Sequence, residues 1–123
     1  MLAFTPSSLP RRAGNSLIVV GTIAASGNYA TGGDTLDLSQ VPGLATSLAP
    51  DNVDIVSAGS PGSGWIYGFV PGTNLSNNKM QVFGQSGSQG SATALTELAA
   101  GAYPAGVTGD KINAILTFLN FGQ

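Results

Sequence analysis

The sequence predicts an all-β protein, an antiparallel β-sandwich of jelly-roll type, with a small barrel as the alternative architecture. Two observations carry this prediction. Seven or eight short segments are rich in β-branched and aromatic residues or alternate apolar with polar ones, and the connectors between them are dense in Gly, Pro and Asn. Almost no segment shows the periodicity of a helix. Short strands joined by tight turns are typical of sandwiches and small barrels.

The chain has two expected parts. Its 123 residues suffice for one domain, which we place at residues 15–123 as a single β-sandwich, preceded by an extended N-terminal arm at residues 1–14. The arm contains Pro6 and Pro10, and proline fixes φ and removes a backbone donor. Its few apolar groups do not offset the cost of ordering its backbone. We therefore expect the arm to be mobile in the isolated subunit and to be ordered by a partner.

The first strands of the domain are predicted from composition and alternation. Residues 17–26, LIVVGTIAAS, are rich in β-branched residues and are bounded by turn formers, which predicts a strand. After a glycine turn, residues 35–39, TLDLS, alternate apolar and polar side chains, as a half-buried strand does. Residues 41–52 contain two prolines and are expected to form a loop.

The second half repeats this pattern. Residues 53–59, 64–72 and 79–85 are predicted strands, and the Asn-rich connector before the last of these resembles a hairpin loop because Asn tolerates positive φ. Residues 92–100, ATALTELAA, fit a helix or a strand, and we favour a strand or an irregular edge. Residues 111–121, KINAILTFLNF, alternate and contain Ile, Thr and Phe, which favours a closing strand over a helix.

Composition removes several classes of function. The chain has no Cys and no His, so thiolate metal sites and the commonest general base are absent. It has four basic residues, too few for a stripe that follows phosphates, and we expect no nucleic-acid partner. No apolar stretch approaches the ~18 residues of a membrane span, and the N-terminus lacks the features of a signal peptide. We therefore expect no membrane partner and no export.

The acidic residues offer little chemistry. Asp34 with Asp37, and Asp51 with Asp54, supply too few oxygens for calcium. For the first pair we expect instead a glycine turn in which Asp34 accepts backbone hydrogen bonds. A glycosidase needs two carboxylates across a cleft, and the candidates are Asp34, Asp37, Asp51, Asp54, Glu97 and Asp110. Without His or a serine-nucleophile motif, we expect no enzyme, no metal and no cofactor.

Aromatic and basic residues suggest binding. Trp65, Tyr67 and Phe69 share one face of a strand by parity, where they would pack a core or an interface. Arg11 and Arg12 form the only basic pair, read either as solvated charges in a frayed terminus or as an anchor to a partner's carboxylates. The candidate partner-contact residues of the arm are Leu2, Phe4, Leu9, Arg11 and Arg12.

Three segments together resemble the small capsid decoration, or cement, proteins of tailed bacteriophages. They are RRAGNSLIVVGTIAASGNYATGGDTLDLS, GWIYGFVPGTNLSNNKMQVFG and ELAAGAYPAGVTGDKINAILTFLNF. The likeness lies in the order of the elements and covers most of the chain. It implies a structural virion protein without a catalytic site that binds the outer surface of an HK97-type shell and stabilises it.

The same resemblance implies partners and a location. The partners would be the major capsid protein and further copies of this chain, as a homo-oligomer for which a trimer is favoured over a dimer. The protein would be made in the host cytoplasm and end on the outer surface of the capsid. The alternative is a β-sandwich carbohydrate-binding or virion fibre domain that stacks sugars on Trp65, Tyr67 and Tyr103. Exposed rings would favour sugar binding, and buried rings would favour the cement protein.

Overall fold

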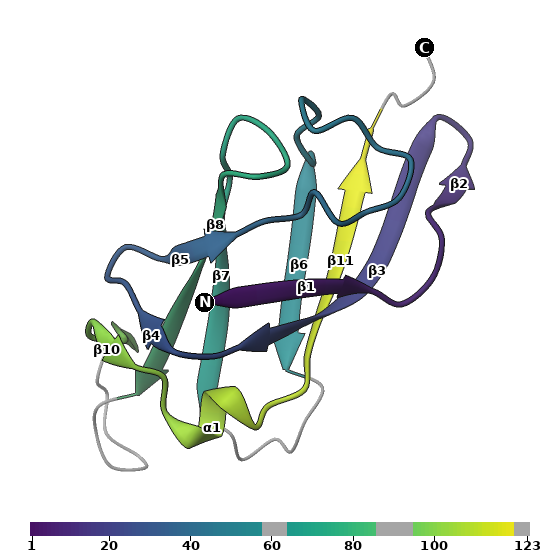
Figure 1. Cartoon of the computed structure of the whole chain (residues 1–123). Helices are drawn as coiled ribbons and strands as arrows, with labels where there is room; N and C mark the ends of the chain where they lie inside the picture. Colours follow the sequence, from purple (N-terminus) through teal and green to yellow (C-terminus); the bar gives the residue numbers. More distant parts are fainter. Residues whose placement is uncertain (58–63, 86–94, 120–123) are drawn as a thin grey trace.

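The fold is built from short antiparallel strands. The computed structural model describes residues 1–57, 64–85 and 95–119, and within these residues it has eleven strands and one four-residue helix. The prediction of an all-β protein is confirmed. Figure 1 shows some strands running across the picture in front of a more upright group, with the helix at the lower end.

The larger sheet has the order β1–β3–β11–β6, and β2 pairs with β3 beyond the end of β1. Its strands are β1 (Leu2–Pro6), β2 (Arg11–Ala13), β3 (Ser16–Ala25), β6 (Asn52–Ser57) and β11 (Ile112–Phe118). Burial alternates along β3 and β11, as expected for strands with one face on a core and one face outside. Every odd-numbered position of β3 from Leu17 onwards is buried.

The second sheet has the order β5–β8–β7, and β9 also pairs with β8. Its strands are β5 (Asp34–Leu36), β7 (Trp65–Val70), β8 (Asn78–Gln85) and β9 (Leu95–Glu97). A separate two-stranded ribbon joins β4 (Asn28–Tyr29) to β10 (Gly101–Ala102), and it leads into the helix α1 (Ala105–Thr108).

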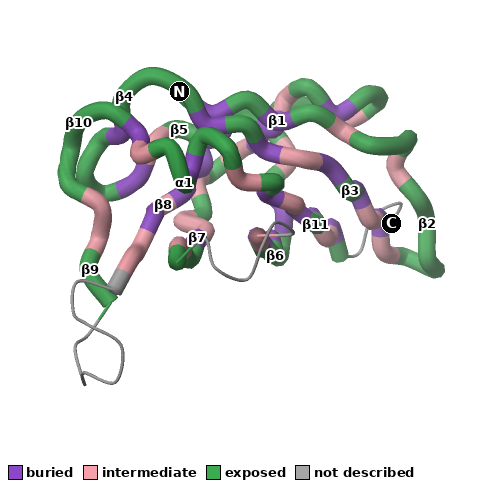
Figure 2. The backbone as a smooth tube through the Cα atoms, turned by 90° about the horizontal axis from the view of Figure 1, so that it is seen from below, coloured by how far each residue is buried: buried purple, intermediate pink, exposed green. Residues whose placement is uncertain are grey.

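The two sheets enclose one core and contact each other at both edges. Strand β6 contacts β7, and β1 contacts β5. Figure 2, seen from below, shows β1 and β5 on the opposite side of the molecule from β6 and β7. The strands therefore form a closed circuit around the core, in which the two sheets meet at both edges without strand pairing among the described residues. The jelly-roll topology is not confirmed.

The N-terminal segment is not the mobile arm that the sequence suggested. Strand β1 pairs with β3 along its whole length, with Leu2 opposite Ala25 and Phe4 opposite Ile23. Leu2 and Phe4 are only 7% and 4% exposed. The reason is the period-two alternation of these residues with exposed neighbours, which gives β1 an apolar face for the core. Hydrophobic burial inside the domain thus supplies the ordering that we had assigned to a partner.

A glycine makes room for this strand. A Cβ atom on Gly21 would lie 2.5 Å from the ring of Phe4 and 2.6 Å from the carbonyl oxygen of Thr5. The aromatic ring therefore rests directly on the backbone of β3, a close approach that only glycine allows.

The prolines mark a bulge in the edge of the sheet. Pro6 pairs with Gly21, whereas Arg11 pairs with Ile18, so four residues, 7–10, stand opposite two residues of β3. Proline is tolerated at such an edge because its missing N–H faces no partner strand. The chain then resumes as β2 and turns into β3 at Gly14, whose φ of +61° suits a two-residue hairpin turn.

Most of the remaining predicted strands are confirmed within the described residues. Strand β3 corresponds to residues 17–26, and β7 and β8 correspond to residues 64–72 and 79–85. Only Asp34–Leu36 of the glycine-turn region is a strand, so the predicted strand at 35–39 ends early. The loop predicted at 41–52 is confirmed up to the start of β6.

Three predictions extend partly outside the described residues. Residues 58–59 of the strand predicted at 53–59 lie outside them, and the described part is β6. Residues 92–94 of the ambiguous segment lie outside them, and Leu95–Glu97 is strand β9, as favoured over a helix. Residues 120–121 of the closing segment also lie outside them, and its described part is strand β11.

The hairpin loop between β7 and β8 is organised by asparagines, as its composition suggested. Asn77 accepts hydrogen bonds at Oδ1 from the N–H groups of Thr73 and Asn74, at 2.9 and 3.0 Å. The fully buried Asn78 accepts one from the N–H of Gly72 at 2.9 Å and donates one to the carbonyl of Asn74 at 3.0 Å. Side-chain amides here replace the backbone partners that the loop lacks.

Candidate functional site

All three tyrosines of the chain donate their hydroxyl groups to carboxylates. Tyr29 donates to Glu97 at 2.6 Å. Tyr67 donates to Asp110, also at 2.6 Å, and Asp110 accepts a second bond from Ser57 Oγ at 2.6 Å. Each of these pairs joins parts of the chain that are distant in sequence. The carboxylates therefore act as structural acceptors that fix buried tyrosines.

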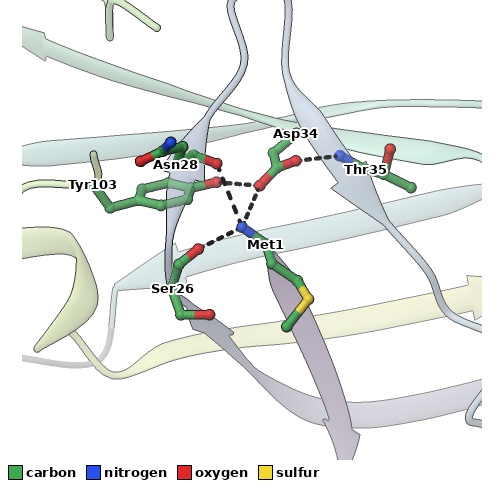
Figure 3. Close-up of polar contacts among 6 residues, drawn as sticks. All are labelled: Met1, Ser26, Asn28, Asp34, Thr35 and Tyr103. Atoms are coloured by element: carbon green, nitrogen blue, oxygen red, sulfur yellow. Dashed lines mark hydrogen bonds and ion pairs between the residues drawn. The ribbon is translucent and has the colours of Figure 1, made fainter. Parts of the chain in front are cut away.

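The third pair lies at the centre of a polar cluster (Figure 3). Tyr103 donates to Asp34 Oδ2 at 2.9 Å, and the α-amino group of Met1 forms an ion pair with the same oxygen at 2.9 Å. The second oxygen of Asp34 accepts the N–H of Thr35 at 3.0 Å. Burial raises the pKa of Asp34, but the hydrogen bonds from the α-amino group and Tyr103 outweigh it, so this pKa lies below its usual value.

The glycine turn before Asp34 is held by the neighbouring tyrosine–carboxylate pair. Glu97 accepts the N–H of Gly32 at 2.6 Å as well as the hydroxyl of Tyr29. Gly32 and Gly33 have φ of +91° and +107°, a region that favours glycine. Burial and the hydrogen bond to Glu97 raise the pKa of Tyr29 to about 12. The hydrogen bond from Tyr29 lowers the pKa of Glu97.

The prediction that Asp34 follows a glycine turn and accepts a backbone hydrogen bond is thus confirmed, and the donor is the N–H of Thr35. Asp37 accepts the N–H of Ser39 at 2.9 Å, in a turn of its own. Asp51 accepts the N–H of Leu119 at 2.6 Å. In residues 1–57, 64–85 and 95–119, His, Cys, Asp and Glu form no group of three or more that could hold a metal ion.

The aromatic strand faces inward. Tyr67 and Tyr103 are each 7% exposed, and Trp65 and Phe69 are partly buried against the core. A Cβ atom on Gly84 would lie 2.7 Å from the indole of Trp65, so this ring rests on the backbone of β8. The predicted packing of these rings in a core is confirmed. The buried rings of Tyr67 and Tyr103 cannot stack a sugar, whereas Trp65 is only partly buried.

The five candidate contact residues are divided by the fold. Leu2 and Phe4 lie in the core and cannot touch a partner. Leu9, in the bulge, is 74% exposed, and Arg11 and Arg12 lie on the exposed strand β2. Arg11 is opposite Ile18 and so lies on the outer face of the sheet, whereas Arg12 is opposite Leu17. The bulge and β2, residues 7–13, therefore form an exposed edge that we call the edge segment.

A second exposed surface was not anticipated: the outer face of the sheet β1–β3–β11–β6. Val20, Ile115 and Val56 on this face are 39%, 41% and 55% exposed. The other outward positions of these described strands are Ala, Ser, Thr, Ile and Asn, apart from Arg11 and Asp54. Large apolar side chains on a nearly uncharged face indicate a surface that binds another molecule.

A signal for this face was present in the sequence. In a strand with one wet face, every second residue should be polar. Ile18, Val20 and Ile115 occupy the outward phase of β3 and β11 and are nevertheless β-branched and apolar. Considering the odd- and even-numbered positions of these segments separately would have revealed the second row of apolar residues.

No other described feature competes with these two surfaces. A hollow of about 320 Å³ beside β1 is lined by Met1, Leu2, Ala3, Phe4, Asp37 and Gln40. Its only carboxylate already accepts a turn hydrogen bond. Within the described residues no helix is long and apolar enough to cross a membrane.

A comparison of the chain with models of known protein families, with curated protein sequences and with solved structures finds no match.

Proposed function

We propose that this chain is a decoration, or cement, protein that binds the outer surface of an HK97-type bacteriophage capsid and stabilises it. The observation that carries the proposal is the combination of broad uncharged exposed surface with acidic residues that serve as internal acceptors. Such a molecule is suited to attachment through surface contact. The resemblance of its sequence segments to cement proteins points to the same role.

The edge segment is the proposed contact with the major capsid protein. Leu9 offers an apolar side chain that is 74% exposed, and the guanidinium groups of Arg11 and Arg12 follow it on β2. Arginine forks bind carboxylates in a bidentate manner, so acidic side chains on the shell are suitable partners. Leu2 and Phe4 contribute indirectly because they hold β1 in the sheet.

This arrangement changes the expected energetics of attachment. A free arm would lose conformational freedom on binding, at a cost of about 1–2 kcal/mol per residue. The edge segment is anchored by β1 on one side and by the hairpin to β3 on the other. Because its backbone is already ordered, more of the contact energy is available for binding. The protein would also act as a homo-oligomer, which multiplies weak contacts on a repetitive shell.

Co-sedimentation with capsids tests the proposal. Purified shells from the phage whose genome encodes the chain, stripped of this protein, should bind it saturably and then resist heating better. Changing both Arg11 and Arg12 to Ala should weaken attachment and make it less sensitive to salt. The matched control changes Lys79 on β8 and Lys111 just before β11 to Ala, which removes the same charge from exposed positions elsewhere.

The outcome that rejects the proposal is equally direct. Shells that bind no wild-type protein, or that bind it without any gain in heat resistance, would exclude a cement role. If the arginine pair and the lysine pair have equal effects, the edge segment is not the specific contact, even if attachment occurs.

A further inference from the structure

The centre of the outer face has a regular apolar arrangement. Val20 of β3 and Ile115 of β11 are direct partners across the two central strands, and both are about two-fifths exposed, at 39% and 41%. Val56 of β6 is 55% exposed. Ile18 lies on the same face, two residues from Val20. These side chains form a ridge of β-branched residues that no described segment of the chain covers.

The charges on this face lie at its opposite edges. Arg11 is on β2, next to β3, and Asp54 is on β6, next to β11. Asp54 accepts a long hydrogen bond, 3.4 Å, from the side-chain amide of Asn52. The face therefore has an apolar middle, one positive edge and one negative edge.

We propose that two copies of this chain pack face to face through the outer surface of the sheet β1–β3–β11–β6. The two-fold axis runs parallel to the strands, between β3 and β11. Rotation about this axis places β3 of one copy against β11 of the other, so Val20 meets Ile115 of the second copy. It also places β2 against β6, which brings Arg11 towards Asp54 of the second copy.

The register makes this charge contact feasible. Paired residues lie side by side across the sheet and form a row. Arg11 lies in the row of Ile18 and Thr117, and Asp54 lies in the next row on this face, with Val20 and Ile115. Neighbouring rows on one face are about 7 Å apart along the strands. An extended arginine side chain can cover that offset, and the two-fold axis forms the pair twice.

The features of the face favour a second copy over other occupants. A two-fold contact requires a patch that is complementary to itself, and here each edge charge meets its opposite. A strongly acidic or basic partner would find one of the two edge charges unfavourable. The proposal does not depend on capsid binding, because the pair should form from the isolated protein. In this dimer Arg11 faces the second copy, so the shell contact proposed above falls to Leu9 and Arg12. It differs from the trimer that the sequence resemblance favoured.

The first test measures the mass of the isolated full chain by sedimentation over a concentration series. We expect a monomer–dimer equilibrium. Ile115→Lys, which puts a charge on the central ridge, should weaken the dimer by at least roughly tenfold, equivalent to about 1.4 kcal/mol. The matched control is Ile66→Lys: Ile66 is a 52% exposed residue on β7 of the other sheet, and this change should leave the dimer intact.

The second test exchanges the edge charges. Arg11→Asp and Asp54→Arg should each weaken the dimer because they place like charges together, and the double variant should restore it. Thermal unfolding of each variant verifies that the fold is kept.

Three results would overturn the inference: a wild-type chain that stays monomeric or forms trimers, a dimer that Ile115→Lys and Ile66→Lys affect equally, and a double variant that is no stronger than the single ones. Capsid sedimentation is scored separately, so failure of the dimer leaves the proposed function standing.

Discussion

At the scale of residues, the notable feature is how the small set of ionisable groups is used. Asp34, Glu97 and Asp110 accept the hydroxyl groups of buried tyrosines, and Tyr29 and Tyr103 also contact each other edge to face at 5.6 Å between ring centres. Composition alone correctly indicated scarce charge. It could not indicate these pairs, because each one joins positions more than forty residues apart.

The cluster around Asp34 predicts an acid-sensitive component of stability. The folded-state pKa of Asp34 lies below its ordinary value of 3.8, so its contribution is present above that pH and is lost as the pH falls through the folded-state value. We expect Asp34→Asn to lower the free energy of unfolding near pH 6. The difference in the free energy of unfolding between wild type and variant should shrink as the pH falls below about 4.

Chemical denaturation at several pH values measures this difference. Asp37→Asn is the control, since that carboxylate accepts a local turn bond on an exposed segment. A difference that stays constant down to the acid limit would contradict the assignment.

The tyrosines predict the opposite behaviour in alkali. Burial and the hydrogen bond to Glu97 raise the pKa of Tyr29 from 10.0 to about 12, and burial raises the pKa values of Tyr67 and Tyr103 as well. Their contribution to stability is therefore full below pH 10 and is lost as the pH rises towards the folded-state values. Tyrosinate absorbance in an alkaline titration should appear late and together with unfolding. Ionisation of a tyrosine near pH 10 in a folded chain would disprove this.

At the scale of elements, β1 shows why the sequence misled. The long strands β3 and β11 could be predicted because alternation and β-branched residues extend over seven or more positions. Strand β1 has only five residues, ends in Pro6 and is followed by Pro10, so local propensity favoured an irregular arm. The decisive factor is tertiary: the groove over Gly21 accepts the ring of Phe4. The helix α1 and strands β4 and β10 are too short for any periodic signal.

Shortening the core side chain of β1 should therefore destabilise the folded protein. We expect Phe4→Ala to lower the free energy of unfolding by about 3–5 kcal/mol, as for other buried aromatic residues. Thr5→Ala, at the neighbouring exposed position, should cost less than about 0.5 kcal/mol. Urea denaturation of both variants tests the pair. Equal, small effects would mean that β1 is a detachable arm after all.

At the scale of the whole molecule, the sequence indicated the class but not the arrangement. Turn-rich composition was enough for an all-β protein. The closure at β6 with β7 and β1 with β5 depends on which strands meet, and no local pattern encodes that choice. The interaction surface was partly accessible from the sequence. The exposed arginines were identified, and the outward apolar residues of β3 and β11 could have been found, but their union into one face depends on the pairing of these two strands.

The closed circuit predicts cooperative unfolding. Because the sheets share one core, fluorescence of Trp65 in one sheet and far-ultraviolet circular dichroism of all strands should report the same midpoint. Separate transitions for the two signals would show that the sheets are independent units.

The pairing of β3 with β11 has a consequence for synthesis on the ribosome. Ile23 pairs with Ile112, so most of the chain must be translated before the central strand pair can form. Until then the nascent β3 has an open hydrogen-bonding edge and apolar side chains on both faces, which is the kind of segment that associates with other nascent chains. Folding should thus be late and non-local, governed by loop closure. Expression at reduced translation rate would prolong this exposed stage and should favour aggregation over native protein.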